Sequence, residues 1–393
     1  MRIPGGRADG GWGPSPGGWP HVLFVAAACV SLASWAAAER LAPPEVVSRS
    51  LAMRAAAERM GEAEAAVRDR RQDLGMPPDP ATDPNRTGLI GPAYDELFTT
   101  LGDLEAKRTA TNPDAAALLV HLLGLAGVQP GDTVAIAASG SFPGLLVAAL
   151  TATEALGAEP ITVLSLGASS HGLTDPDFHL LDLHRLLVAE RVVRSPPAAV
   201  SLGGTRDRGE EWEPRTRERV LERLRSSGVP LILEPELPAS VARRMEVYGM
   251  GAGGTGGSRP PVAAFVNAGG ADANVGISPT LLSLRPGLLA PADVPLPPAA
   301  QQGVLHAMAA AGVPVIHLLD MRGLAGRHGL PWDPVPLPTR GTTRLLRGDP
   351  APATPLPLIA GTWLAAMMIL AAVGVMISRR STETSTLPLG NGP

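Results

Sequence analysis

The stretch that decides the fold runs from Asp132 to Leu166 and reads DTVAIAASGSFPGLLVAALTATEALGAEPITVLSL. It holds a short apolar run, a glycine turn, a longer apolar stretch and a second short apolar run. Short runs bounded by turn residues are typical of buried strands, and the longer stretch is typical of a helix. We therefore predict strands at Thr133–Ser139 and Pro160–Leu166, with a helix at Pro143–Leu156 between them.

The same alternation continues toward the C-terminus. Such alternation indicates right-handed βαβ units, so the predicted fold class is α/β with a doubly wound, mostly parallel, Rossmann-like sheet. We assign this α/β domain to residues 83–346. The further predicted helices are Asp177–Glu190, Arg215–Ser226, Ala239–Tyr248 and Gln301–Ala311, and the further strands are Ala198–Leu202, Leu231–Glu234, Val262–Asn267 and Val315–Leu319.

Composition excludes several classes of protein. The 393 residues are 45% hydrophobic and carry a net charge of -4, so there is no overall basic character of the kind that nucleic-acid binding needs. Aromatic residues make up only 3%, which disfavours base-stacking surfaces. No His/Cys/Asp/Glu cluster has metal-site spacing, and no cofactor is predicted. The single cysteine, Cys29, excludes an intramolecular disulfide.

Apolar segments flank the domain at residues 21–39 and 356–377, and they carry no charge from Val22 to Ala38 and from Leu356 to Ile377. Each is long enough to cross a bilayer, so we expect one N-terminal and one C-terminal transmembrane helix. Arginines such as Arg2 and Arg379 lie beyond the two segments, which favours a two-pass protein of the cell membrane with its domain outside the cytoplasm. Arginines before the second segment oppose this orientation, and a cleaved signal peptide is the alternative for the first segment.

The remaining segments are expected to be tails and a connector. Residues 1–20 form a short tail, and residues 378–393 form a disordered tail. Residues 40–80 are rich in Ala, Arg and Glu before a run of prolines, which predicts a helical stalk followed by a Pro-rich linker. The apolar stripe of this helix is thin, so we expect it to be solvated or paired with a partner.

Ligands of doubly wound folds bind at the carboxyl ends of the strands, where four loops are candidates. The first loop, Ser139–Gly144, joins a strand to a helix, so free N–H groups and the helix dipole favour an anion there. It matches neither a Walker loop, nor GxGxxG, nor GxSxG. Ser139 and Gly140 are candidates for substrate binding. Ser141 is the candidate nucleophile, unless it only caps the helix.

The second loop, Gly167–Gly172, carries Ser169, Ser170 and His171 and is followed by Asp175. A serine, a histidine and an aspartate so close together suggest a hydrolase triad. The stronger interpretation is that the hydroxyls stabilise turns and that the aspartate begins a helix. We keep the two serines as candidates for substrate binding.

The third and fourth loops contain paired glycines, which let a ligand approach the backbone closely. The candidates for substrate binding are Gly203 and Gly204 in one loop, and Asn267, Gly269 and Gly270 in the other. Tight turns explain these glycines equally well.

A further candidate lies ahead of the sheet, in LEAKRTATNP at Leu104–Pro113. Lys107 and Arg108 are adjacent cations, and with Asn112 and several hydroxyls they suggest a binding loop for a carboxylate or phosphate. The competing interpretation is a helix end followed by the N-cap of a helix that starts near Pro113. Lys107 is also the only lysine of the chain.

Three segments resemble the family called poly-γ-glutamate system proteins: Asp83–Val120, Asp132–Leu145 and Gly312–Pro338. The most distinctive motifs of that family, LEAKRT-x-TNP and SGSFP, are both intact. The resemblance covers most of residues 83–345 and implies a bacterial membrane protein associated with the machinery that makes or exports poly-γ-glutamate. It implies no particular reaction. His171 stands where the family often has an aromatic residue, which weakens any role for it.

The leading hypothesis is therefore an accessory membrane protein of poly-γ-glutamate biosynthesis or export. Its domain would bind the polymer, or a glutamate-bearing intermediate, through Lys107, Arg108 and the Ser139–Gly144 loop. Two alternatives remain open: a serine-dependent hydrolase or acyl transferase with Ser141 as nucleophile, and a non-catalytic scaffold for synthase subunits. The expected partners are the polymer or its synthase subunits and the lipid bilayer, with no nucleic acid.

Overall fold

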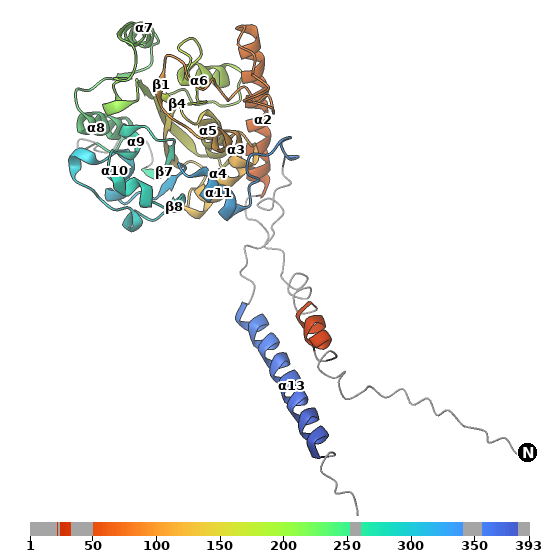
Figure 1. The fold of residues 1–393 in the computed structure, drawn as a ribbon. Helices are drawn as coiled ribbons and strands as arrows, with labels where there is room; N and C mark the ends of the chain where they lie inside the picture. Colours follow the sequence, from red (N-terminus) through yellow and green to blue (C-terminus); the bar gives the residue numbers. More distant parts are fainter. Residues whose placement is uncertain (1–21, 23, 33–49, 252–260, 341–355, 384–393) are drawn as a thin grey trace, which may run out of the picture. The chain divides into compact units, whose positions relative to one another are not determined.

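The computed structural model describes residues 22, 24–32, 50–251, 261–340 and 356–383 (Figure 1). The chain divides into two compact units. One unit spans Val46–Gly348, and the other contains the two ends of the chain, Met1–Glu45 and Asp349–Pro393.

Within the described residues, the larger unit is built around a seven-stranded sheet of order β6-β5-β3-β2-β7-β9-β8. Its neighbours pair in parallel, except for β8 and β9, which are antiparallel. The prediction of an α/β fold with a mostly parallel, Rossmann-like sheet is confirmed. The strands are β2 (Thr133–Ser139), β3 (Glu159–Ser165), β5 (Ala199–Ser201), β6 (Leu231–Ile232), β7 (Val262–Ala268), β8 (Gly287–Leu289) and β9 (Val315–His317).

The order of the strands defines where a ligand site is expected. From β2 the chain moves outward through β3 and β5 to β6, and then returns to the other side of β2 to form β7. The direction of winding therefore reverses between β2 and β7. In open α/β sheets, the crevice beyond the carboxyl ends of such strands is the usual binding position.

Strand β2 lies in the middle of the sheet and has the bounds predicted from sequence. Every one of its residues is buried, because helices cover both faces of the sheet. Val134, Ile136 and Ala138 belong to one apolar core, whereas Ala135 and Ala137 belong to the other. This division follows from the two-residue period of a strand.

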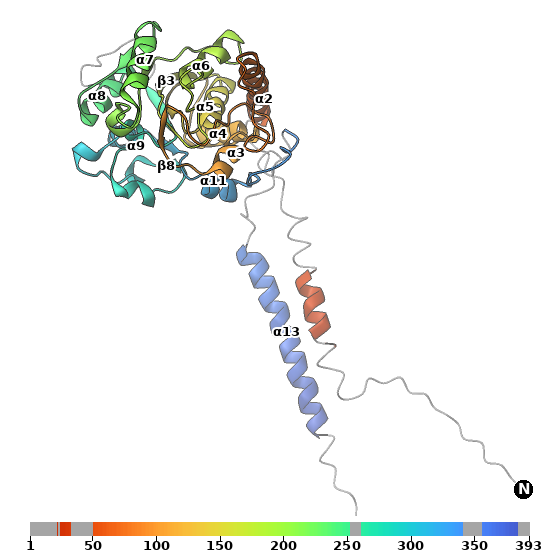
Figure 2. The same cartoon turned by 45° about the horizontal axis from the view of Figure 1, so that its top comes forward.

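The helices form two layers around the sheet (Figures 1 and 2). The first core contains side chains of α2, α4, α5, α6 and α7, and the second contains side chains of α8, α9 and α10. The helices of the larger unit are α2 (Ser50–Asp73), α3 (Leu104–Ala110), α4 (Asp114–Leu125), α5 (Pro143–Ala155), α6 (Leu180–Ala189), α7 (Pro214–Arg225), α8 (Leu237–Val247), α9 (Asp272–Val275), α10 (Val304–Ala310) and α11 (Met321–His328).

The helix α2 differs from the solvated stalk expected over residues 40–80. It packs against α4 and α5, and Met53, Met60 and Val67 are fully buried there. These positions are spaced by seven residues, so they lie on one face of the helix, as in any helix that covers a core. By contrast, Leu51, which the sequence places in the apolar stripe, is exposed.

Several short elements were not predicted. Strands β1 (Phe98–Thr100) and β4 (Ala168–Ser169) pair in parallel outside the main sheet. The antiparallel strand β8 and the helices α9 and α11 were also missed. The 3₁₀ helices are η1 (Thr205–Asp207), η2 (Pro279–Ser283), η3 (Pro291–Asp293) and η4 (Ala299–Gln301).

In the smaller unit, residues 24–32 are helical and α13 spans Leu356–Glu383. Trp363 Nε1 donates a hydrogen bond to Ser31 Oγ at 2.7 Å. No helix in the described part of the chain is both long enough and apolar enough to cross a membrane. Residues 378–383, expected in a disordered tail, continue α13. The predicted tail at 1–20 and the rest of the predicted tail after 383 lie outside the described residues.

Candidate functional site

Lys107 is the central residue of the first candidate site. It lies on α3 with only 2% of its surface exposed. Its Nζ donates to Ser169 Oγ at 2.9 Å and to the carbonyl oxygen of Ser141. The ring centroid of Phe142 lies 4.7 Å from Nζ. The amine therefore joins the loop after β2 to the loop after β3.

The chain around α3 explains why Lys107 points inward. Asp103 caps α3, accepting hydrogen bonds from the backbone N–H groups of Glu105 and Ala106. Just before this cap, Gly102 contacts the site. A Cβ atom at that position would lie 2.8 Å from Ser169 Oγ and 2.9 Å from Lys107 Cε. Any larger residue would therefore press on both partners.

The environment of Lys107 favours its neutral amine. Burial is the main cause and lowers its pKa to about 7, while the carboxylate of Asp103 acts in the opposite direction. A substantial share of the amine is therefore unprotonated near neutral pH. A neutral amine at hydrogen-bond distance from a hydroxyl can accept its proton.

Ser141, the predicted nucleophile and helix cap, has a different role in the structure. Phe142 is the residue that caps α5, without a side-chain hydrogen bond. The Oγ of Ser141 instead accepts a hydrogen bond from the backbone N–H of Ser169 at 3.0 Å. Since Lys107 contacts only the carbonyl of Ser141, the hydroxyl that it contacts is that of Ser169.

Arg108 and Asn112 do not form a shared anion site with Lys107. The Arg108 guanidinium donates from Nε to Asp333 Oδ1 at 2.6 Å, and its second nitrogen donates to the other oxygen of the same carboxylate. Asn112 Oδ1 accepts from the backbone N–H of Asp114 at 3.1 Å, at the start of α4. The competing interpretation from sequence is therefore right about the helix end, but the residue that caps α4 is Pro113, without a side-chain hydrogen bond.

The outer side of α3 is held by a segment from the far end of the domain. Asp333 binds Arg108, and its backbone N–H donates to Thr109 Oγ1 at 2.9 Å. The indole of Trp332 donates to a carboxylate oxygen of Glu105 at 2.9 Å. The helix that carries Lys107 is therefore fixed from both sides.

The triad suggested for the second loop is not assembled. In the described part of the chain, no hydrogen bond joins His171 to Ser169 or to Asp175. The carboxylate of Asp175 accepts from the backbone N–H of Asp177 at 2.7 Å, as expected for a turn. Ser170 Oγ is buried and has no hydrogen-bond partner among the described residues.

A second candidate site lies where β2 and β7 end, on the face covered by α8 and α9. Among the described residues, Ser139 Oγ and Asn267 Oδ1 are buried without a hydrogen-bond partner. Asn274 Nδ2 and Arg244 Nε are buried and unpartnered as well. Gly269 lies directly against Ser139, since a Cβ at position 269 would come within 2.2 Å of Ser139 Oγ.

These atoms belong to one buried polar layer. Ser139 pairs with Ser165, and Ser165 pairs with Ser201, so three serines stand side by side on adjacent strands. The buried guanidinium of Arg244 donates to Ser165 Oγ at 3.0 Å and to Ser201 Oγ at 2.6 Å. It also binds Asp207, with nitrogen–oxygen distances of 2.8 and 2.9 Å, and Asn274 Oδ1 at 3.1 Å.

The remaining predicted residues have local structural roles. Gly203 and Gly204 both have positive φ angles, 75° and 68°, and turn the chain from β5 toward Asp207. Gly140 lies so close to the backbone oxygen of Leu166 that a Cβ would come within 2.4 Å of it. Gly270 is exposed, beside the second site.

Nothing in the sequence indicated Arg244, whereas Asp207 and Asn274 end the third and fourth candidate loops but were not singled out as site residues. Arg244 lies in α8, whose sequence shows no motif, and it follows another arginine, Arg243, that faces solvent. Only the tertiary structure shows that one arginine of this pair enters the core.

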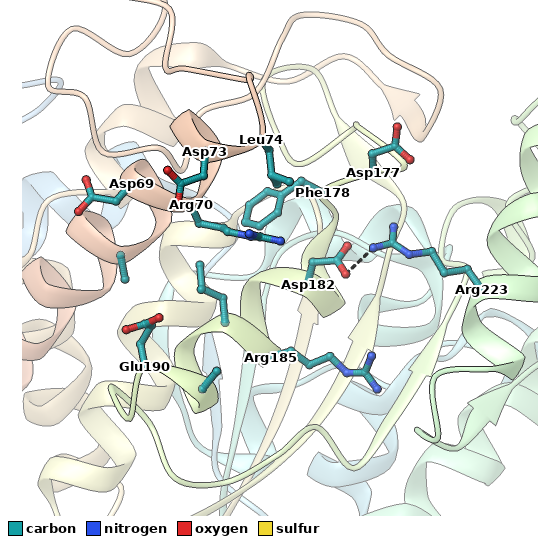
Figure 3. Close-up of a pocket in the computed structure, with 13 residues that line it drawn as sticks. Asp69, Arg70, Asp73, Leu74, Asp177, Phe178, Asp182, Arg185, Glu190 and Arg223 are labelled. Carbon is teal, nitrogen blue, oxygen red and sulfur yellow. Dashed lines mark hydrogen bonds and ion pairs between the residues drawn. The ribbon is translucent and has the colours of Figure 1, made fainter.

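A cavity of about 540 Å³ lies between α2 and α6 beside Arg223 of α7, away from the predicted site residues (Figure 3). Arg223 pairs with Asp182 at 2.6 Å across it. The other charged residues that line it are Asp69, Arg70, Asp73, Asp177, Arg185 and Glu190. Among the described residues, no group of three or more His, Cys, Asp or Glu side chains could hold a metal ion.

Comparison with known proteins adds no assignment. No protein-family model, curated protein or solved structure matches the chain. The geometry of the two sites and the sequence segments described above are therefore the evidence for function.

Proposed function

We propose that the protein is an accessory membrane protein of poly-γ-glutamate biosynthesis or export, and that its α/β domain binds a glutamate-bearing ligand at the carboxyl ends of β2 and β7. The pathway and the membrane setting rest on the resemblance of the LEAKRT-x-TNP and SGSFP segments. The apolar segments at 21–39 and 356–377 would attach the chain to the bilayer with its domain outside the cytoplasm.

The observation that supports binding is the set of unpartnered polar atoms at the carboxyl ends of β2 and β7. A buried polar group without a hydrogen bond costs about 1–3 kcal/mol. Among the described residues, such atoms belong to Ser139 and Asn267 near the ends of β2 and β7, and to Arg244 and Asn274, which are hydrogen-bonded to each other. A ligand that completes their hydrogen bonds would recover this cost.

The chemistry of these atoms matches a γ-glutamyl unit. Arg244 Nε and Asn274 Nδ2 are donors, and a free carboxylate of the ligand would accept from them. Asn267 Oδ1 is an acceptor, and an amide N–H of the ligand would donate to it. Arg244 is already neutralised by Asp207 at 2.8 Å, so the site favours a hydrogen-bonding pattern over a general polyanion.

The test is the binding of poly-γ-glutamate by the full-length protein, measured by calorimetry beside poly-α-glutamate of equal length. Asn267→Ala and Asn274→Ala should each weaken binding about tenfold, since each removes one hydrogen bond to the ligand. Asn85→Ala is the matched control, because Asn85 donates to the carbonyl of Pro334. Equal affinity in all three variants, or equal affinity for both polymers, would contradict the assignment.

A second candidate function, a serine-dependent hydrolase or acyl transferase, is favoured by a different observation. Lys107 is buried in direct contact with the hydroxyl of Ser169. The scaffold alternative has no comparable observation in its favour.

A further inference from the structure

We infer that Ser169 and Lys107 form a catalytic pair for acyl transfer, with Ser169 as the nucleophile, Lys107 as the general base and an amide as the substrate class. The pair is assigned from its own geometry. Only the identity of the amide, a γ-glutamyl bond, rests on the proposed function.

The two side chains are arranged for proton transfer. Lys107 Nζ lies 2.9 Å from Ser169 Oγ, which is the distance a proton transfer requires. Ser141 fixes both partners, because its carbonyl accepts from Nζ and its hydroxyl accepts from the backbone N–H of Ser169. Ser141 is therefore a positioning residue.

The surroundings of the Lys107 amine favour its neutral form. A base must be unprotonated at the working pH, and a lysine reaches that state only when it is desolvated. Lys107 is buried, and the charge that opposes its deprotonation is the carboxylate of Asp103. His171 lies near enough to be affected by the charge of Lys107, but burial keeps that imidazole largely neutral, with a lowered pKa.

The reaction balances with water as the second substrate. As Ser169 Oγ bonds to the carbonyl carbon of the amide, its proton passes to the neutral Nζ of Lys107. The tetrahedral intermediate collapses, the C–N bond breaks, and the ammonium of Lys107 returns the proton to the leaving amine. Water then attacks the ester carbon and gives a proton to the neutral Nζ of Lys107, the C–Oγ bond breaks, and Nζ returns that proton to Ser169 Oγ. The carboxylic acid released ionises to a carboxylate. An amine in place of water would give transfer instead of hydrolysis.

Close packing around the hydroxyl makes its reactivity sensitive to a change at Gly102. Ser169 is buried except for 6% of its surface, and Gly102 lies directly against its Oγ. Leu101, the residue before this glycine, is exposed. Because Gly102 does not have a positive φ angle, an alanine there would keep the backbone and press directly on the Ser169 hydroxyl and on Lys107.

The test uses the full-length protein and a fluorophosphonate, a serine-reactive probe, with mass spectrometry to locate the label. Wild type should be labelled at Ser169, at a rate that rises with pH around 7. Ser169→Ala should abolish the label, and Lys107→Met should slow it by at least about 100-fold, the usual contribution of a general base. Gly102→Ala should also slow it.

Lys107→Arg separates a base from a merely structural cation. Arginine keeps the positive charge and can donate hydrogen bonds, but it cannot accept a proton at any ordinary pH. Loss of labelling in a folded Lys107→Arg variant supports the inference. Normal labelling in that variant, a label on Ser141, or no label on the folded wild-type protein would overturn it.

A variant that fails to fold does not end the test, because Lys107 is the only lysine of the chain. Amine-selective acylation of the wild-type protein, followed by mass spectrometry at increasing pH, reports the titration of this one side chain. Titration near 7 supports the inference, and titration near the ordinary value of about 10.4 refutes it.

The two proposals fail separately. Fluorophosphonate labelling reports on the catalytic pair and calorimetry reports on the ligand, and Asn85→Ala should keep both wild-type labelling and wild-type binding. Wild-type protein incubated with the polymer should shorten it, and Ser169→Ala should not. Probe labelling without any polymer binding or shortening would retain the catalytic pair and reject the proposed ligand. Polymer binding without labelling would retain the proposed ligand and reject the catalytic pair.

Discussion

The burial of Lys107 predicts a specific dependence of stability on pH. Its pKa is lowered from 10.5 to about 7 in the folded protein, chiefly by desolvation. In the unfolded chain the amine returns to its ordinary value. The change to be made is Lys107→Met, which retains much of the volume of the side chain and removes its titration.

The magnitude follows from the two pKa values. Their difference is 10.5 minus about 7, or about 3.5 units, and each unit corresponds to about 1.4 kcal/mol. Between the two values the unfolded chain binds more protons than the folded one. The free energy of unfolding should therefore rise with pH across this window, in total by about 5 kcal/mol. Below pH 7 the Lys107 amine is protonated in both the folded and the unfolded protein, so the full cost of burying its charge destabilises the fold.

The assay is denaturant unfolding of the full-length wild type and of Lys107→Met at several pH values between about 7 and 10. Other groups also titrate in this range, so the informative quantity is the difference between the two proteins. Lost hydrogen bonds change that difference by a constant, whereas titration of the amine gives it a slope. The difference should rise by about 1 kcal/mol per pH unit in favour of wild type. A difference that stays level with pH would refute the reasoning, because it would mean that the buried amine keeps its proton.

Three further predictions concern stability. Gly269→Ala should destabilise the fold by about 1–3 kcal/mol in denaturant titrations, since Gly269 has a φ angle of 112° and a Cβ there would meet Ser139 Oγ. Adding Ser139→Ala should recover part of the loss, and a double variant no better than the single one would contradict this. Asp207→Ala should cost about 3–5 kcal/mol, seen as a lower Tm, because it leaves Arg244 as an unpaired buried charge; a Tm close to wild type would oppose it. Burial lowers the pKa of His184 to about 4, so the unfolded state binds more protons between that value and 6.5. Stability should fall by about 3 kcal/mol as pH drops through this window, and His184→Gln should lack that loss.

Most of the sheet is predictable from sequence because its strands are apolar and separated by clear turns. The bounds of β2 are those predicted, and α5 and α7 begin at or within one residue of the expected position. The pair β1 and β4 was not predictable. It is short and contains Thr and Ser, and its pairing depends on how the loop after β3 meets the segment before α3.

Polar loops at the carboxyl ends of the strands predicted candidate sites at that edge of the sheet, but not how the side chains there are arranged. The error was to treat Lys107 and Arg108 as a pair. Successive side chains of a helix point about 100° apart, so adjacent cations cannot face the same ligand. In the structure Lys107 enters the core, while Arg108 turns to Asp333.

The contacts that hold α3 have a consequence for how the protein is made. Lys107 and Ser169 leave the ribosome long before Trp332 and Asp333, whose bonds to Glu105, Arg108 and Thr109 fix the outer side of the helix. Closing so long a loop is entropically costly, and it cannot happen before the distal segment has been synthesised. A nascent or prematurely ended chain that lacks Trp332 and Asp333 would therefore contain the serine and the lysine without the contacts that fix the outer side of α3, so synthesis of this distal segment controls when the pair is fully secured.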